Sequence, residues 1–288
     1  MKIIQHIADL RNAIEEARTA HRTADFCIGF VPTMGALHAG HASLIARSVK
    51  ECSLTVVSVF VNPTQFNDPK DLRNYPRTME ADCELIESLG GNIVFAPTVE
   101  EMYPEVDNRQ FSYPPIDTVM EGEKRPGHFN GVCQIVSKLF DAVQPNRAYF
   151  GEKDFQQIAV VRAMVNDLGY NIELVSCPIV REKDGLAMSS RNTLLSVEER
   201  QKAVHISQAL FESRSFVPGH RVDEVHTFVV EKLNAIEGLE VEYFDIVNAD
   251  TLQSITNWDE AERVQGCITV FCGTRPVRLI DNISYKPS

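Results

Sequence analysis

The stretch Phe26-Cys-Ile-Gly-Phe-Val-Pro-Thr-Met-Gly-Ala-Leu-His-Ala-Gly-His41 determines the architecture that we expect for this chain. It opens with a short apolar run that ends at Pro32, and a glycine-containing loop follows. A helical pattern then begins at His41 and continues through the apolar residues Leu44, Ile45 and Val49. An apolar strand, a loop and an amphipathic helix in this order open a parallel α/β unit.

The same alternation continues along the first two-thirds of the chain. Further strands are expected at Leu54–Val61, Ile93–Ala96, Ala148–Phe150 and Ile172–Val175. Helices are expected at Met79–Leu89, Val132–Val143 and Phe155–Leu168. Such alternation predicts the α/β class, with a Rossmann-like parallel sheet covered by helices.

Beyond about residue 178 the pattern changes. A loop from Arg181 to Asn192 leads to helices at 197–213 and 222–236, and strand-like stretches follow at Val241–Val247 and Cys267–Cys272. We therefore expect a Rossmann-like ligand-binding domain over residues 1–178. A smaller α+β domain over residues 179–288 is expected to close over the site.

The composition excludes several classes of function. The formal net charge is −12 and no basic run is longer than two residues, so nucleic acid is not expected as a partner. The seven cysteines lack CxxC spacing, which favours reduced thiols in the core over a disulfide framework or a zinc knuckle. No signal-peptide core and no membrane-length apolar run is found, so we expect a cytoplasmic protein without membrane association.

The segment Pro32–His41 is the first candidate for binding chemistry. Parallel sheets bind ligands beyond the carboxyl ends of their strands, and a helix N-terminus there suits phosphate. His38 and His41 are three residues apart, so both can face one pocket and stabilise negative charge on a phosphate. The alternatives are a tight turn with two exposed histidines, or a metal site with His128 as the third ligand; no HExxH pattern supports the latter.

Two further segments carry polar groups suited to a small acid. Asn62 and Gln65 follow the second strand, and their amides can bind hydroxyl and carboxylate groups; a proline-containing turn with capping amides is the alternative. Arg125 and His128 lie in the segment Arg125-Pro-Gly-His-Phe-Asn-Gly131, which either closes over a ligand or forms a surface turn.

Two more segments suggest contacts to a nucleotide. Lys153 supplies a point charge, Asp154 can cap a helix or contact ribose, and Gln157 follows one turn later. Ser189-Ser-Arg191 combines two hydroxyls with a guanidinium and resembles a phosphate clamp, although the serines could be helix caps. Together the segments predict an enzyme that uses ATP to activate a small carboxylic acid.

Taken in order, these segments resemble the pantothenate synthetases (pantoate–β-alanine ligases), a family within the wider HxGH nucleotidyltransferase superfamily. The first segment alone would indicate only the superfamily. The resemblance runs from about residue 25 to 282. It rests on Pro32–His41, Phe60–Phe66, Tyr75-Pro-Arg77, Arg125–Phe129, Phe150–Gln157, Asp184–Asn192, Tyr243–Val247 and Arg278–Asn282.

The resemblance implies ATP-dependent condensation of (R)-pantoate with β-alanine through a pantoyl-adenylate, with release of AMP and diphosphate. It implies catalytic roles for His41, His38, Lys153 and Arg191, with His41 similar to a residue assigned as proton donor. The implied substrate-binding residues are Gln65, Gln157, Asn62, Arg125 and His128. ATP would lie along Met34, Gly35, Ala36, Leu37, His38, Ala39, Gly40, His41, Gly151, Glu152, Lys153, Asp154, Val180, Met188, Ser189, Ser190 and Arg191.

Other implications concern metal and assembly. Mg²⁺ would neutralise the ATP phosphates, with Asp82 as a candidate ligand by position, and the family is a homodimer. The chain departs from the family pattern at Ala39, where many members carry an acidic residue, and at Ala81-Asp82, where an acidic pair is sometimes found; the second departure bears on the magnesium ligand. The alternatives are another HxGH-type acid-activating ligase, a nucleotidyltransferase, a metal hydrolase, and a nucleotide-binding module without catalysis.

Overall fold

The computed structural model describes residues 1–21, 25–67, 69–217 and 219–286. The chain divides into two compact units. The first comprises Met1–Tyr113, Arg125–Glu152 and Gln157–Pro178, and the second Pro114–Lys124, Lys153–Gln156 and Ile179–Ser288. Two short pieces expected in the first domain thus belong to the second unit. The division into separate domains at about residue 178 stays a prediction.

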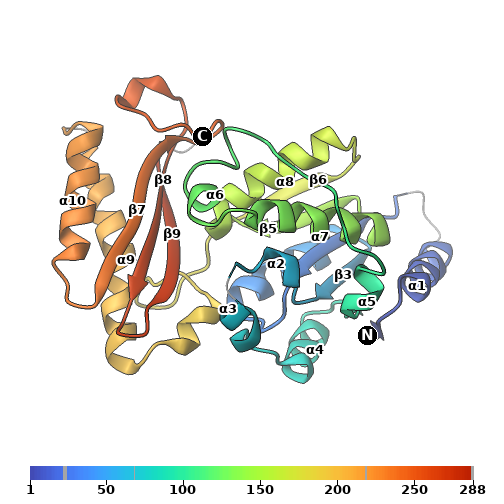
Figure 1. Ribbon diagram of the computed structural model, residues 1–288. Coiled ribbons are helices and arrows are strands. Elements are labelled where there is room, and N and C mark those ends of the chain that lie inside the picture. The colour runs from blue at the N-terminus through green and yellow to red at the C-terminus, as the bar shows by residue number, and fades with distance from the viewer. Residues whose placement is uncertain (22–24, 68, 218, 287–288) are drawn as a thin grey trace. The chain divides into compact units, whose positions relative to one another are not determined.

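A six-stranded parallel sheet forms the centre of the first unit, as predicted (Figure 1). The strand order is β1-β4-β3-β2-β5-β6. β1, an edge strand of three residues with mostly exposed side chains, was not anticipated. The strands are β1 (Lys2–Ile4), β2 (Ile28–Thr33), β3 (Leu54–Val59), β4 (Ile93–Phe95), β5 (Arg147–Gly151) and β6 (Glu173–Cys177).

The period of two along β2 sends neighbouring side chains to opposite faces of the sheet. Val31 packs in one core with Leu44 and Ile45 of α2. Phe30 instead meets Phe140 of α7 edge-on, with ring centroids 6.2 Å apart. The helices of this unit are α1 (Ile7–Ala20), α2 (Ala39–Glu51), α3 (Pro69–Asn74), α4 (Met79–Ser88), α5 (Val99–Met102), α7 (His128–Val143) and α8 (Phe155–Asp167), with a 3₁₀ turn η1 (Pro63–Gln65). The first two residues of α8, Phe155 and Gln156, belong to the second unit.

The strand order creates a switch point beside β2. This strand pairs with β3 on one side and with β5 on the other. The chain builds β3 and β4 on one side of β2, and the connection from β4 to β5 then continues the sheet on the other side. In open parallel sheets, ligands bind outside the carboxyl ends of the strands at such a point. The loop that follows β2 and the end of β5 at Gly151 both lie at this edge.

The second unit is built on a three-stranded antiparallel sheet in the order β7-β8-β9 (Figure 1). Two long helices pack against it, and the predicted apolar face of α10 is buried through Val225, Val229 and Leu233. The elements are α6 (Glu121–Lys124), the 3₁₀ turn η3 (Ser190–Leu194), α9 (Val197–Phe216), α10 (Val222–Asn234), β7 (Leu239–Asn248), the 3₁₀ turn η4 (Trp258–Glu260), β8 (Val264–Cys272) and β9 (Val277–Lys286). The 3₁₀ turn η2 (Glu152–Asp154) holds residues of both units.

Four of the seven cysteines are core residues, as the composition predicted, and the other three are half-buried. All seven are free thiols, and Cys133, Cys177, Cys267 and Cys272 are buried. Burial raises the pKa of Cys272 to about 11, which keeps this thiol protonated at neutral pH. In the described ranges, none of the helices combines the length and apolar character that a bilayer crossing requires.

Candidate active site

Two histidines shape the start of α2. His38 is the N-cap residue, and its Nδ1 accepts a hydrogen bond from the backbone N–H of Gly40 at 3.1 Å. His41 Nδ1 in turn accepts a hydrogen bond from the backbone N–H of His38 at 3.3 Å. The ring centroids are 4.1 Å apart. This reciprocal capping box holds both rings at the helix N-terminus, where the sequence analysis expected them to meet phosphate.

The capping box also determines which ring nitrogen carries the proton. A nitrogen that accepts a hydrogen bond bears no proton, so each neutral ring is protonated at Nε2. A proton on Nδ1 would face a backbone N–H and break the box. In each neutral ring, Nε2–H is therefore the hydrogen-bond donor.

The backbone between β2 and α2 is held by a buried carboxylate. Gly35 and Ala36 both have positive φ values, of 82° and 51°. The Asp82 side chain, on α4, accepts hydrogen bonds from the N–H of Ala36 at 3.0 Å and of Leu37 at 2.8 Å, and the Thr78 hydroxyl donates to it at 3.1 Å. The sequence analysis expected Asp82 to bind Mg²⁺, but here both of its oxygens contact the loop.

A magnesium site is not evident from the residues themselves. No group of three or more His, Cys, Asp or Glu side chains in the described part of the chain could hold a metal ion. Mg²⁺ in nucleotide sites often relies on phosphates, waters and one or two carboxylates. Asp82 is only 2% exposed and has both oxygens occupied, so it does not fit this role. The magnesium site stays a prediction.

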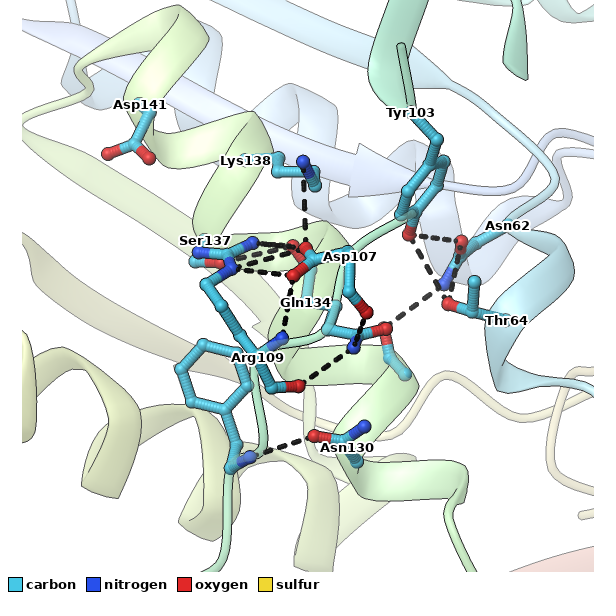
Figure 2. Close-up of polar contacts among 12 residues, drawn as sticks. Asn62, Thr64, Tyr103, Asp107, Arg109, Asn130, Gln134, Ser137, Lys138 and Asp141 are labelled. Atoms are coloured by element: carbon cyan, nitrogen blue, oxygen red, sulfur yellow. Dashed lines mark hydrogen bonds and ion pairs between the residues drawn. The ribbon is translucent and has the colours of Figure 1, made fainter. Parts of the chain in front are cut away.

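The amides that follow β3 form one hydrogen-bonded group. Asn62 is 1% exposed, and its Nδ2 donates to Gln65 Oε1 and to the carbonyl of Gly131, both at 3.1 Å. Its Oδ1 accepts from the hydroxyls of Tyr103 at 2.7 Å and Thr64 at 3.2 Å (Figure 2). Burial raises the pKa of Tyr103, so this phenol keeps the proton that it donates.

Three predicted segments meet at Gln65. Its Nε2 donates to the sulfur of Met34 at 3.2 Å, which links it to the loop after β2. Its backbone carbonyl accepts from His128 Nδ1 at 2.9 Å, and Arg125 Nη1 lies 3.2 Å from His128 Nε2. Because the carbonyl can only accept, Nδ1 of His128 carries the proton and Nε2 accepts from the arginine. The first unit thus brings Met34, Asn62, Gln65, Arg125 and His128 together.

Helix α7 can lie directly on this group because of one glycine. A Cβ at Gly131 would be 2.5 Å from the carbonyl oxygen of Thr64 and 2.9 Å from Cα of Gln65. No larger residue fits such an approach without displacing the backbone. The close packing places the first turn of α7, with His128, against the 3₁₀ turn that carries Gln65.

The phosphate-clamp segment lies in the second unit, in a loop fixed by β9. Arg181 forms two hydrogen bonds to the buried carboxylate of Asp281, at 2.7 and 2.9 Å. The N–H of Met188 donates to the carbonyl of Val180 at 3.0 Å, which closes a small hairpin. Ser189 caps the 3₁₀ turn η3, with its hydroxyl accepting from the N–H of Arg191 at 3.2 Å. Ser189 therefore acts as a cap here, the alternative that the sequence left open.

Lys153 is also supported by β9. Its carbonyl accepts from Asn282 Nδ2 at 2.9 Å, and Gln265 Nε2 holds Asn282 Oδ1 at 2.7 Å. Its ammonium lies 3.4 Å from Asp154. Asp281 and Asn282 lie in a segment that resembles the family, but no role for either residue could be predicted. The available signal was a pair of adjacent polar residues between Ile280 and Ile283, in the middle of the strand.

The predicted nucleotide-binding residues are divided between the two units. Residues 34–41, Gly151 and Glu152 belong to the first. Gln157, which was predicted to bind pantoate, is half-buried in the first turn of α8 and belongs to the first unit as well. Lys153, Asp154, Val180 and residues 188–191 belong to the second. Their joint binding of ATP stays a prediction.

Comparison with known proteins decides the family. The family model described as pantoate-beta-alanine ligase matches residues 2–284. The chain belongs to this family. The predicted family, α/β fold class and ligase function are confirmed.

Relatives of the family match the chain over its whole length. The pantothenate synthetase of Bacteroides fragilis (strain YCH46) is 61% identical over 288 residues, covering 100% of both chains. The crystal structure of pantothenate synthetase from Thermus thermophilus is 42% identical, with a TM-score of 0.90 and 100% of both chains covered. A pantoate-β-alanine ligase from Francisella tularensis, complexed with β-γ ATP and β-alanine, is 32% identical, with a TM-score of 0.81 and 100% and 99% covered.

Proposed function

We propose that this chain condenses (R)-pantoate with β-alanine in two steps, using ATP and releasing AMP and diphosphate. The family assignment supports this reaction, as does the bound β-γ ATP and β-alanine of the Francisella tularensis relative. The observation that carries the proposal is the histidine capping box at the switch point of the sheet. It offers two Nε2–H donors and a helix N-terminus where phosphates would lie.

In the first step the pantoate carboxylate attacks the α-phosphorus of ATP, and diphosphate leaves. Such phosphoryl chemistry depends on positioning and on charge stabilisation rather than on a protein nucleophile. His38 and His41 would donate hydrogen bonds to phosphate oxygens, and Lys153 and Arg191 would neutralise charge that grows on the leaving diphosphate. Mg²⁺, bound to the ATP phosphates, would add further neutralisation.

Gln65 and Gln157 would hold the pantoate hydroxyl and carboxylate groups, with Asn62 orienting Gln65. In the second step the β-alanine amine attacks the carbonyl carbon of the adenylate, loses a proton and displaces AMP. Water competes with the amine for this intermediate, so the reaction requires a site that excludes it. We further propose that the protein acts in the cytoplasm as a homodimer.

Product analysis tests the reaction. Purified protein with ATP, MgCl₂, pantoate and β-alanine should yield pantothenate, AMP and diphosphate in equal amounts. Formation of ADP and phosphate would point instead to an acyl-phosphate. Diphosphate without AMP would indicate a nucleotidyltransferase, and ATP binding without turnover a non-catalytic module.

A further inference from the structure

Asp82 is a carboxylate with an unusual environment for a residue outside the core of the sheet. It lies in the first turn of α4 and is 2% exposed. Its Oδ2 accepts from the N–H of Ala36, and its Oδ1 accepts from the N–H of Leu37 and from the Thr78 hydroxyl. Each oxygen is therefore directed at donors of the protein.

The loop that Asp82 binds has a backbone that needs support. Ala36 has a φ of 51°, a left-handed conformation that residues with a Cβ rarely adopt. Gly35, with a φ of 82°, precedes it, and a Cβ there would stand 3.0 Å from Asp82 Oδ2. Hydrogen bonds from backbone N–H to a buried carboxylate are stronger than neutral ones, so they can hold such a conformation.

The loop leads directly to the histidine capping box. Leu37 is followed by His38, whose own backbone N–H and side chain form the box. A change in the direction of the Leu37 peptide therefore reorients the residue that caps α2. Asp82 thus acts on the histidines through the backbone that it binds.

We propose that Asp82 is a positioning residue for the loop Met34–His38 and not a ligand of Mg²⁺. Its contacts account for both carboxylate oxygens, and its neighbour Ala81 offers no second carboxylate for a metal. The consequence for catalysis rests on the proposed function, in which this loop binds ATP. The structural role does not depend on it.

Hydrogen–deuterium exchange of the metal-free protein tests the structural role. Asp82→Asn is nearly isosteric, but its amide can offer only one acceptor, and its NH₂ group faces a backbone N–H. We expect the amides in the peptide covering residues 34–41 to exchange about tenfold faster or more in this variant. Glu80→Gln, an exposed acid in the same helical turn, should leave exchange unchanged. Unchanged exchange in Asp82→Asn would overturn the proposal.

A magnesium titration separates the two roles of the carboxylate. At saturating substrates, Asp82→Asn should lower kcat about tenfold or more at every Mg²⁺ concentration, with the half-saturating concentration within twofold of the unmodified protein. A half-saturating concentration raised several-fold, with the full rate recovered at high Mg²⁺, would show that Asp82 binds the metal. If the unmodified protein makes no pantothenate, the proposed function fails, while exchange still decides the role of Asp82.

A milder variant guards against a misfolded Asp82→Asn. Thr78→Val removes one donor to Asp82 Oδ1 and keeps the carboxylate. The same peptide should then exchange a few-fold faster, while peptides of β8 in the second unit stay unchanged. No change in this variant, together with an unfolded Asp82→Asn by circular dichroism, would count against loop positioning.

Discussion

At the scale of single residues, protonation of the two loop histidines is set by the backbone around them. Nδ1 of each accepts an N–H, so the neutral rings carry their protons on Nε2. His41→Ala and Lys153→Ala should both slow adenylate formation by about 10²-fold or more, because charge on the phosphates is greater in the transition state than in bound ATP. Rapid-quench measurement of diphosphate in a single turnover checks this.

The second half-reaction provides the control for this prediction. Chemically prepared pantoyl-adenylate bypasses the use of ATP, so both variants should convert it with β-alanine much better than they turn over ATP and pantoate. An equal loss in both half-reactions, with unchanged circular dichroism, would place these residues in amide formation instead.

Tyr103 was not recognised in the sequence, although it is joined to the predicted acid site. Its hydroxyl donates to Asn62 Oδ1 at 2.7 Å (Figure 2). This contact fixes the Asn62 amide so that Nδ2 faces Gln65. The Lys138 ammonium lies 5.2 Å from the centroid of the Tyr103 ring. Tyr103 is thus linked through Asn62 to Gln65, a predicted binding residue.

Tyr103→Phe should therefore raise the Michaelis constant for pantoate about 3- to 10-fold and leave that for ATP unchanged, since about 1 kcal/mol is lost with one hydrogen bond. Tyr113→Phe is a matched control, because the Tyr113 hydroxyl contacts Asp167 in the same unit. Gln65→Ala is the reference variant, because it shows how far the Michaelis constant for pantoate rises when the predicted acid-binding amide itself is removed. A large effect of Gln65→Ala with none from Tyr103→Phe would mean that Asn62 needs no orienting partner.

At the scale of elements, the segment after α5 is fastened to α7 by ion pairs and amide contacts. Arg109 donates hydrogen bonds from Nε and Nη2 to the two carboxylate oxygens of Asp107 (Figure 2). The ammonium of Lys138, on α7, lies 3.5 Å from the same carboxylate. Gln134, also on α7, donates to the carbonyls of Asp107 and Arg109 at 3.0 and 2.9 Å. Together these contacts attach the chain between Tyr103 and Phe111 to the helix that carries His128.

The hydrogen bonds from Arg109 lower the pKa of Asp107 to about 2, from an ordinary value of 3.8. A lowered folded-state pKa gives stability that is complete above about pH 4 and is lost as the pH falls towards 2. Asp107→Asn should lower the free energy of unfolding by about 2 kcal/mol at pH 7, and the difference should shrink below pH 4. Urea unfolding at several pH values checks this, with the exposed Glu105→Gln as control.

Elements whose residues follow one clear apolar pattern could be predicted from the sequence. Elements that mix apolar with charged or polar residues could not. The strands β2 and β3 are buried almost throughout, so their apolar runs are unambiguous. Helix α1 buries only Leu10, Ala13 and Ile14 among charged residues, which weakens its pattern. Strand β9 interrupts its apolar residues with Asp281 and Asn282, whose partners lie far away in the sequence.

At the scale of the whole molecule, the sequence pointed to candidate ligand-binding residues but not to the residues that hold them in place. The loop histidines, Gln65 and Lys153 follow strands and could be predicted from position and chemistry. The roles of Asp82, Tyr103 and Asn282 depend on contacts between segments far apart in the chain, such as Asn282 to Lys153, which are separated by 129 residues. Spacing along a chain contains no information on such contacts.

The division into two units also depends on distant contacts. Glu121 lies in a piece of the second unit that precedes Arg125 of the first. Its carboxylate forms two hydrogen bonds with Arg278 at 2.6 and 2.7 Å, and it also accepts from the hydroxyls of Tyr243 and Thr269. The Glu121 side chain is only 12% exposed. This cluster attaches Pro114–Lys124 to the C-terminal sheet.

Removing one partner of a buried ion pair leaves an uncompensated charge, which is strongly destabilising. Glu121→Gln should therefore lower the stability of the second unit by about 3 kcal/mol. Trp258, the single tryptophan of the chain, lies in this unit, so its fluorescence during urea unfolding reports on it. Glu123→Gln is the control, because Glu123 is 64% exposed and pairs with its neighbour Lys124. An equal midpoint for both variants would mean that Glu242, which also binds Arg278, compensates fully for the loss of Glu121.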